Sequence, residues 1–239
     1  MCEQFVVNAE EPFRLGDLWA LAEGLERYGI AGFGWGVAWV DGEGRIGSHR
    51  DVRAFRDDPS RSELDAVETR AALVHLRRPS KLSTVTEADT QPFEDPKGRF
   101  AFGHNGDFRT YRPWRERYLA ADRIAGRADS EVAQRWLEDR WPGAKFGDGN
   151  GDVLAELHRT FGGEANLALL TPDGVVRHYA GNTENPLFTF RLDRLKVVST
   201  GLYSIDRSLF RFVAPTATER HVVPAGFTAV LASARPVRV

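Results

Sequence analysis

Cysteine is almost absent from this chain: Cys2 is the only one among 239 residues. A disulfide framework is therefore excluded, and a chain of this length can bury a substantial core without one. Long apolar runs are also missing, since the longest, residues 30–40, is rich in glycine and far short of the roughly 20 residues of a membrane-spanning helix. No signal-peptide pattern precedes Glu3, so we expect a cytoplasmic protein that has no membrane partner.

The sequence lacks an excess of either charge, because 32 Lys plus Arg face 34 Asp plus Glu, giving a formal net charge of -2. This balance gives no electrostatic reason to expect nucleic acid as a partner. Arginines and aromatic residues alternate over residues 109–118, a composition that suits nucleic acid or a partner surface, but a solvated helical face is the interpretation we favour. The expected substrate is a small molecule, and we expect a single domain over residues 1–239.

Several motifs of well-known enzyme sites are also absent. The six histidines form neither the H-E-x-x-H pattern nor a cysteine–histidine zinc pattern, and G-x-S-x-G does not occur. The glycines of residues 32–36 do not have dinucleotide-binding spacing. Residues 148–152 begin like a calcium loop, but Val153 stands where glycine is needed and Arg159 where glutamate is needed. We interpret that segment as a turn.

What the chain does contain is a mixture of strand-like and helix-like segments, in which helices lie between the early strands and hairpins follow. This order predicts an α+β architecture of packed layers. Strands are expected at residues 4–8, 35–40, 71–76, 100–104, 166–170, 175–179, 187–190, 196–199, 221–223 and 227–231. Helices are expected at residues 18–28 behind an Asp17 cap, from a capping box at residues 62–65, and at residues 109–118, 129–141 and 153–161.

Polar residues gather where two of these predicted strands end. One strand ends in His75-Leu76-Arg77, and the strand at residues 100–104 is followed by Asn105-Gly106-Asp107, which we interpret as a turn. Between them, residues 78–96 are rich in Ser, Thr and Pro and show no periodicity. A loop of this length is typical of a functional segment.

Cys2 gains a second property if Met1 is removed, because it then carries a thiol and a free α-amino group. Their unperturbed pKa values are about 8.5 and about 7.7 to 8.0. A nucleophile with its own base needs no separate histidine. A lone cysteine near a terminus also has a plainer explanation, as a small apolar or incidental residue. Cys2 by itself leaves both interpretations open.

Four features in this order resemble the glutaminase domain of the class II glutamine amidotransferases, which are N-terminal nucleophile hydrolases. They are Met1-Cys2, His75-Leu76-Arg77, His104-Asn105-Gly106-Asp107 and Asp129-Ser130-Glu131. Gly34-Trp35-Gly36 and Gln91-Pro92-Phe93 fall where the family has similar short motifs. The resemblance implies a four-layer αββα sandwich of two mainly antiparallel sheets between helical layers. It also implies that the mature chain starts at Cys2.

The resemblance also assigns roles to individual residues. Cys2 is the expected nucleophile, and the Asn105 side chain with the Gly106 N–H is the expected oxyanion hole. The planar guanidinium of Arg77 would bind the α-carboxylate of glutamine, and Asp129 would accept from its α-ammonium group. Taken alone, Asn105-Gly106 could be only a turn, Arg77 a surface residue and Asp129 a helix cap.

The segment Arg77-Arg78-Pro79-Ser80 departs from the family, which has a small residue and then threonine after its arginine. Ser80 is expected to replace that threonine in binding substrate. His75 and His104 are expected to be structural.

The implied reaction is hydrolysis of the side-chain amide of glutamine, or of a γ-glutamyl amide, through a Cys2 thioester. It releases glutamate and ammonia or an amine, and it requires no metal and no cofactor. Because no synthase segment follows, we expect either an ammonia-accepting synthetase subunit as partner or a γ-glutamyl small molecule as substrate, as in small-thiol metabolism. A catalytically silent binding or scaffold protein is the third hypothesis.

Overall fold

The computed structural model describes residues 2–146, 152–202, 208 and 210–232. Met1 and most of the calcium-loop-like segment, residues 148–151, lie outside the described residues, so the turn expected there is not tested. Within the described ranges, no helix has both the length and the apolar character needed to cross a bilayer.

The described strands form two sheets in which every paired neighbour is antiparallel. The seven-stranded sheet has the order β11-β9-β10-β1-β4-β2-β3, and the five-stranded sheet has the order β12-β8-β7-β6-β5. The strand bounds are β1 Glu3–Arg14, β2 Trp35–Val40, β3 Ile46–Asp51, β4 Glu68–Leu76, β5 Phe93–Glu94, β6 Ala101–Asp107, β7 Glu164–Leu170, β8 Val176–Gly181, β9 Leu187–Leu192, β10 Leu195–Thr200, β11 Thr218–Val222 and β12 Thr228–Leu231.

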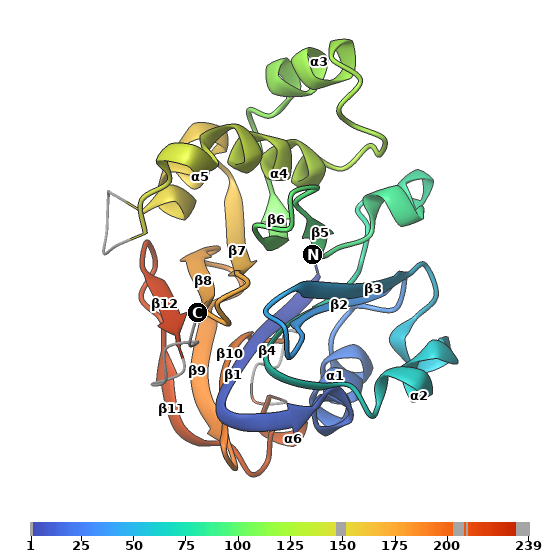
Figure 1. The fold of residues 1–239 in the computed structure, drawn as a ribbon, viewed down its shortest axis with the longest axis vertical. Coiled ribbons are helices and arrows are strands. Elements are labelled where there is room, and N and C mark those ends of the chain that lie inside the picture. The colour runs from blue at the N-terminus through green and yellow to red at the C-terminus, as the bar shows by residue number, and fades with distance from the viewer. Residues whose placement is uncertain (1, 147–151, 203–207, 209, 233–239) are drawn as a thin grey trace.

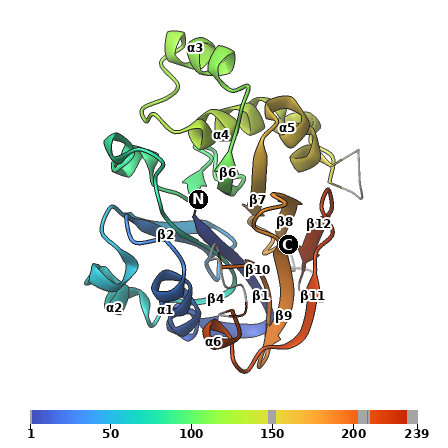
Figure 2. The same cartoon turned by 180° about the vertical axis from the view of Figure 1, so that it is seen from behind.

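Helices cover the outer face of each sheet. Their bounds are α1 Trp19–Tyr28, α2 Ser60–Leu64, α3 Arg112–Ala120, α4 Asp129–Arg140, α5 Val153–Phe161 and α6 Phe210–Val213. Figures 1 and 2 show α1 and α6 against the seven-stranded sheet, and α4 and α5 over the five-stranded sheet with α3 outermost. This is the expected four-layer αββα sandwich, and the α+β prediction is confirmed.

Three apolar clusters fill the spaces between these four layers, and β1 shows how one strand serves two of them. Phe5 and Val7 join the cluster under α1, whereas Val6 joins the cluster between the sheets. Successive side chains of a strand point to opposite faces, so a strand buried on both faces must be apolar throughout. The start of β1 lies in the middle of the molecule, near β5 and β6 (Figure 1).

Most predicted elements are present, and several strands are longer than expected. The strand predicted at residues 4–8 continues to Arg14, and Pro12 is tolerated because the pairing with β4 is irregular between Asn8 and Phe13.

Three expectations about local structure are wrong. The first α-helix begins at Trp19, with Leu18 and not Asp17 as its cap residue. Residues 62–65 end the short helix α2 instead of opening it.

The third wrong expectation concerns the active-site region. Asn105-Gly106-Asp107 is not a turn but the end of β6, where these residues pair with Asn166, Ala165 and Glu164 of β7. Pairing with a neighbouring strand has overridden the local turn preference of the three residues. The consequence is that Asn105 sits on a rigid sheet.

Candidate active site

Cys2 stands immediately before β1, which is paired on both sides, with β10 and with β4. Its backbone nitrogen donates a hydrogen bond to Oδ1 of Asn105 at 2.9 Å. This contact joins the start of a central strand of one sheet to the end of β6 in the other sheet. The predicted nucleophile and the predicted oxyanion residue are thus neighbours.

The Cys2 thiol is half-buried and lies against the backbone of Arg78. The Arg78 N–H points at Sγ with a nitrogen–sulfur distance of 3.3 Å, and Sγ lies 3.5 Å from the Arg78 carbonyl oxygen. Burial raises the pKa of the Cys2 thiol, while the Arg78 N–H and the positive charge of Arg77 act in the opposite direction. The sulfur therefore has a fixed position in which its ionised form has a hydrogen-bond donor.

Asn105 is fully buried, and the two ends of its carboxamide differ. Oδ1 accepts from Cys2, whereas Nδ2 has no hydrogen-bond partner among the described residues. Gly106 follows with φ +154, and a Cβ added there would lie 1.7 Å from the carbonyl oxygen of Glu164. Only glycine fits this backbone position.

Arg77 follows β4 and is buried rather than a surface residue, with 4% of its area exposed. Its N–H donates to the Gly34 carbonyl at 2.8 Å, and its own carbonyl accepts from the N–H groups of Gly32 and Phe33. In the side chain, Nη2 donates to the Thr84 carbonyl, but Nη1 is buried without a partner among the described residues. Half of this guanidinium fork therefore has donors without a partner, which an anionic ligand would satisfy.

Asp129 is the first residue of α4, and Ala128 rather than Asp129 is the cap residue. Its Oδ2 accepts from the Phe108 N–H at 2.8 Å, which fixes the carboxylate beside the end of β6. Burial raises the pKa of Asp129 above its ordinary value, although the hydrogen bonds that it accepts oppose this effect. A cationic ligand group would restore its charged form.

Ser80 is exposed and lies two residues after Arg78, whose backbone contacts the Cys2 sulfur. The residue that does contact Arg77 from this loop is Thr84, through its carbonyl. A substrate role for Ser80 remains a prediction.

His75 and His104 are both buried, and burial lowers the pKa of each to about 3. Both are therefore neutral near pH 7. His104 Nδ1 lies 2.9 Å from the Ser130 hydroxyl, and its ring stacks on Phe108 at 4.0 Å. His75 Nε2 lies 3.3 Å from the His104 carbonyl. These contacts agree with the structural role that we predict for both residues.

Sequence reasoning missed four residues around this site. The Arg78 backbone contacts the nucleophile and the Thr84 carbonyl binds Arg77, but backbone groups leave no signal in residue type. Asp89 is buried, and its Oδ1 accepts from the Arg127 N–H at 2.5 Å and the Ala128 N–H at 2.7 Å. Gln91 is also buried, and its position within a family-like motif was the one available signal.

A second polar cluster lies at the indole nitrogen of Trp35. The side chains of His49, Asp51 and Asp58 place potential metal-binding atoms within 4.8 Å of one another. Arg53 bridges the two carboxylates, at 2.6 Å from Asp51 and 3.0 Å from Asp58. The cluster is an ion-pair network, in which Asp58 also accepts from Trp35 Nε1 at 3.0 Å.

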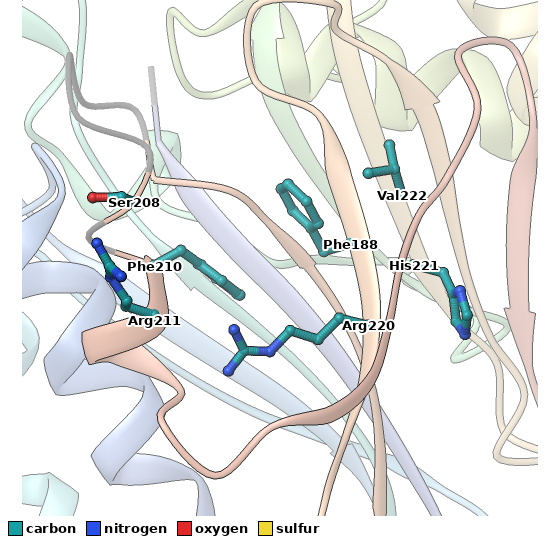
Figure 3. Close-up of a pocket in the computed structure, with 7 residues that line it drawn as sticks. All are labelled: Phe188, Ser208, Phe210, Arg211, Arg220, His221 and Val222. Atoms are coloured by element: carbon teal, nitrogen blue, oxygen red, sulfur yellow. The ribbon is translucent and has the colours of Figure 1, made fainter.

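A cavity of about 380 Å³ opens at a different place, between β9, β11 and α6. Figure 3 shows the Arg220 side chain extending towards Phe210, while His221 points away from both. The cavity contains none of the predicted site residues. Its lining consists of Phe188, Ser208, Phe210, Arg211, Arg220, His221 and Val222.

Two stacked antiparallel sheets between helical layers, with a cysteine before a central strand, define the fold of the N-terminal nucleophile hydrolases. The sequence profile of the family described as "Glutamine amidotransferases class-II" matches residues 1–196. The chain belongs to the class II glutamine amidotransferases. These are enzymes that act on the side-chain amide of glutamine with an N-terminal cysteine as nucleophile. The match to the family profile confirms the resemblance seen in the sequence.

Three solved structures are similar in fold. Glutamine phosphoribosylpyrophosphate amidotransferase from B. subtilis, complexed with ADP and GMP, has a TM-score of 0.71 and 16% identity. A structure described as the allosteric regulatory enzyme of purine biosynthesis has a TM-score of 0.70 and 18% identity. A glutamine aminotransferase class-II domain protein from Silicibacter pomeroyi has a TM-score of 0.58 and 18% identity.

The coverage of these matches differs. The first two cover 96% of this chain but only 47% and 46% of their own chains, so this chain spans about half of their length. The third covers 97% of this chain and 95% of its own. At these identities the likeness shows the fold alone. No curated protein sequence matches the chain.

Proposed function

We propose that residues 1–239 form a single catalytic domain whose mature chain begins at Cys2. It hydrolyses the side-chain amide of glutamine, or of a γ-glutamyl small molecule, through a thioester on Cys2. The observation that carries this proposal is the contact between the Cys2 nitrogen and Asn105, combined with the unpartnered Nδ2 at the other end of the same buried carboxamide. One side chain thus holds the α-amine and offers a donor to a developing oxyanion.

The reaction follows from this geometry once Met1 has been removed. The α-amino group of Cys2 takes the thiol proton, and the thiolate attacks the amide carbon of the substrate. Negative charge then develops on the amide oxygen, where Asn105 Nδ2 and the Gly106 N–H are the proposed donors. When the carbon–nitrogen bond breaks, the α-ammonium group of Cys2 gives its proton to the leaving ammonia or amine.

The second half of the reaction removes the acyl group. Water attacks the γ-glutamyl thioester, with the α-amino group of Cys2 taking a proton from the water, and the carbon–sulfur bond breaks to release glutamate. The thiolate regains a proton and the cycle closes. The residues named supply every proton transfer, so no metal or cofactor is required by this scheme.

Two buried charged groups support an amino-acid substrate. The unpartnered Nη1 of Arg77 suits the α-carboxylate of a glutamyl group, because a carboxylate would accept the hydrogen bonds that Nη1 lacks. The Asp129 carboxylate suits the α-ammonium group, since a cation would offset the cost of its burial. Ser80 lies two residues after Arg78, whose backbone contacts the Cys2 sulfur, and we propose it as a further substrate contact. We propose Arg77 and Asp129 as the principal binding residues.

The fate of the nitrogen separates two versions of the proposal. With glutamine as substrate, an ammonia-accepting synthetase subunit is the expected partner. With a γ-glutamyl amide, the chain acts alone and releases an amine. Release of glutamate much faster from a γ-glutamyl amide than from glutamine would select the second version, whereas co-purification with a synthetase-like protein would select the first.

The decisive experiment is intact mass spectrometry after exposure to a glutamine-like electrophile, such as a glutamine-derived diazoketone. We expect one adduct on a chain that lacks Met1, prevented by excess glutamine or γ-glutamyl amide and absent from Cys2→Ala. An adduct that neither substrate prevents would show a reactive thiol without a glutamyl site. No adduct on processed protein would overturn the enzymatic proposal and leave the binding or scaffold alternative.

A further inference from the structure

Gln91 completes the outer edge of β6 beside the proposed oxyanion residue. In the pairing of β5 with β6, Phe93 is opposite Phe102 and Glu94 is opposite Ala101. Continued by two residues, this register would place Gln91 opposite His104. Strand β5 begins only at Phe93, however, so no strand among the described residues pairs with β6 at His104 on this side.

The Gln91 side chain replaces the missing strand. Its Oε1 accepts from the His104 N–H at 2.6 Å, and its Nε2 donates to the His104 carbonyl at 3.1 Å. These are the two bonds that an antiparallel strand residue exchanges with its partner. The backbone of Gln91 is directed elsewhere, since its carbonyl oxygen would lie 2.4 Å from a Cβ added to Gly36 of β2.

The same amide also contacts the helix that carries Asp129. Gln91 Nε2 lies 3.2 Å from the hydroxyl of Ser130, which in turn lies 2.9 Å from His104 Nδ1. Gln91, His104 and Ser130 are each at least 95% buried, so water does not compete freely for these bonds. Gln91 therefore fixes the residue that immediately precedes Asn105.

We propose that Gln91 is a positioning residue for the oxyanion hole, acting through the His104 backbone on Asn105. The inference rests on the proposed amidase function, and it adds a residue that touches neither the nucleophile nor the glutamyl group. Without the Gln91 amide, the buried His104 N–H loses its hydrogen-bond acceptor and the His104 carbonyl loses its main donor. His75 Nε2, at 3.3 Å, is then the remaining side-chain contact of that carbonyl. The end of β6 would then lose the register that places Asn105 Nδ2.

The chain offers a matched control in Gln134. This glutamine is 1% exposed, lies on α4, and donates through Nε2 to the Glu94 carbonyl at 2.9 Å. It thus makes the same kind of amide-to-backbone bond to the same edge of the sheet, but away from Asn105. Gln91→Met and Gln134→Met each replace one buried amide with a side chain of similar length.

The test compares these variants in turnover, in thiol reactivity and in stability. For Gln91→Met we expect kcat to fall roughly 10- to 100-fold with KM within about 3-fold, because the loss is mainly of transition-state stabilisation and not of substrate binding. Alkylation of Cys2 by iodoacetamide builds no oxyanion, so its rate should fall much less than kcat, although Asn105 Oδ1 also holds the Cys2 nitrogen. Gln91→Met and Gln134→Met should lower the unfolding temperature by similar amounts, because each loses one buried amide. In Gln134→Met, however, kcat should stay within about 2-fold of the wild type.

Three results would overturn the proposal: an unchanged kcat in folded Gln91→Met, an equal loss in Gln134→Met, or a parallel fall in the iodoacetamide rate. If Gln91→Met does not fold, Gln91→Glu keeps an acceptor for the His104 N–H and permits the same comparison. Amide hydrogen exchange over residues 101–108 measures the effect without turnover. Faster exchange in Gln91→Met, but not in Gln134→Met, is expected even if the wild-type chain hydrolyses no amide; unchanged exchange would refute positioning by Gln91.

Discussion

The carboxamide of Asn105 accepts a hydrogen bond from the Cys2 nitrogen at 2.9 Å, although 103 positions separate the two residues in sequence. Asn105 is held by β7 on one side of β6, and its neighbour His104 is held by Gln91 on the other. The start of the chain is therefore fixed against a rigid part of the second sheet. This relationship can be tested by changing one end of the carboxamide at a time.

Asn105→Asp keeps an acceptor for the Cys2 nitrogen and replaces the Nδ2 donor with a negatively charged oxygen. We expect kcat to fall by at least about 10²- to 10³-fold, the usual effect of losing one oxyanion donor. Alkylation by iodoacetamide should still modify Cys2, which separates a lost oxyanion hole from a lost nucleophile. A kcat within 10-fold of the wild type would show that Asn105 Nδ2 is not such a donor.

Arg77→Lys retains a positive charge but removes the planar fork and its contact with the Thr84 carbonyl. We expect KM for glutamine or a γ-glutamyl amide to rise roughly 10- to 100-fold, with a smaller change in kcat, because a lysine cannot bind the carboxylate in the same bidentate way. Steady-state kinetics measure both constants. Arg70→Lys, an exposed change on β4, the strand that Arg77 follows, should leave both as they are; equal behaviour of the two variants would contradict the assignment.

The proposed role of Asp129 predicts that substrate binding depends on pH. Burial raises its pKa above the ordinary value, so the carboxylate gains a proton earlier than usual as the pH falls. KM should therefore increase as the pH drops through this raised pKa, in a window above the ordinary range of an aspartate. Asp129→Asn should raise KM and abolish the dependence in that window, and profiles of KM against pH would reveal it.

The same shift has the opposite consequence for folding. A carboxyl group whose pKa is raised on folding favours the folded state at low pH, and this advantage is lost as the pH rises through the folded pKa. Asp129→Asn keeps an acceptor for the Phe108 N–H, so at pH 7 it should be at least as stable as the wild type in urea unfolding. A large loss of stability at pH 7 would show that the charged carboxylate is required for the fold instead.

Asp58 has the reverse sign. Burial raises its pKa, but hydrogen bonds from His49, the Ser60 N–H and Trp35 outweigh burial and lower it below the usual 3.8. Asp58 therefore stabilises the fold above that value, and the effect is lost as the pH falls through the folded pKa. Asp58→Asn should lower the free energy of unfolding by about 1–3 kcal/mol at pH 7. The difference from the wild type should shrink below pH 3.8.

Exposed Asp57 supplies the control for this experiment. Asp57→Asn removes the same charge one position away and should leave the unfolding free energy within about 0.5 kcal/mol. If the two variants unfolded alike at every pH, the network around Trp35 would contribute nothing specific.

Local sequence pattern predicted the layered fold well where both faces of a strand are buried. Strands β2 and β4 were predicted because residues 35–40 and residues 71–74 are apolar without interruption. Helix α4 was predicted from its acidic start and apolar spacing. The order of short motifs then placed Cys2, Arg77, Asn105 and Asp129 in one family pattern. The structure joins Cys2 to Asn105 by a hydrogen bond and brings Arg77 close enough for its charge to oppose the effect of burial, which raises the pKa of Cys2. Asp129, in contrast, contacts the Phe108 N–H just past the end of β6.

The errors came from contacts between residues distant in sequence. Asn105-Gly106-Asp107 has turn chemistry, yet pairing with β7 keeps it extended. Pro12 breaks a local strand pattern, but the chain remains in β1 at an irregular point of the ladder. Gln91 gave little signal, because its importance lies in two backbone bonds to His104. Such bonds depend on where a strand ends, which residue preferences fix poorly.

The position of Cys2 ahead of a strand paired on both sides makes the fold and the chemistry separable by rearranging the chain. A circular permutant that joined the two ends and opened the chain in an exposed loop would retain β1, its pairing and every side chain named above. Its Cys2 nitrogen would then be an ordinary peptide group, unable to carry the proton that the reaction moves. Such a protein would have the shape of the amidase without its base.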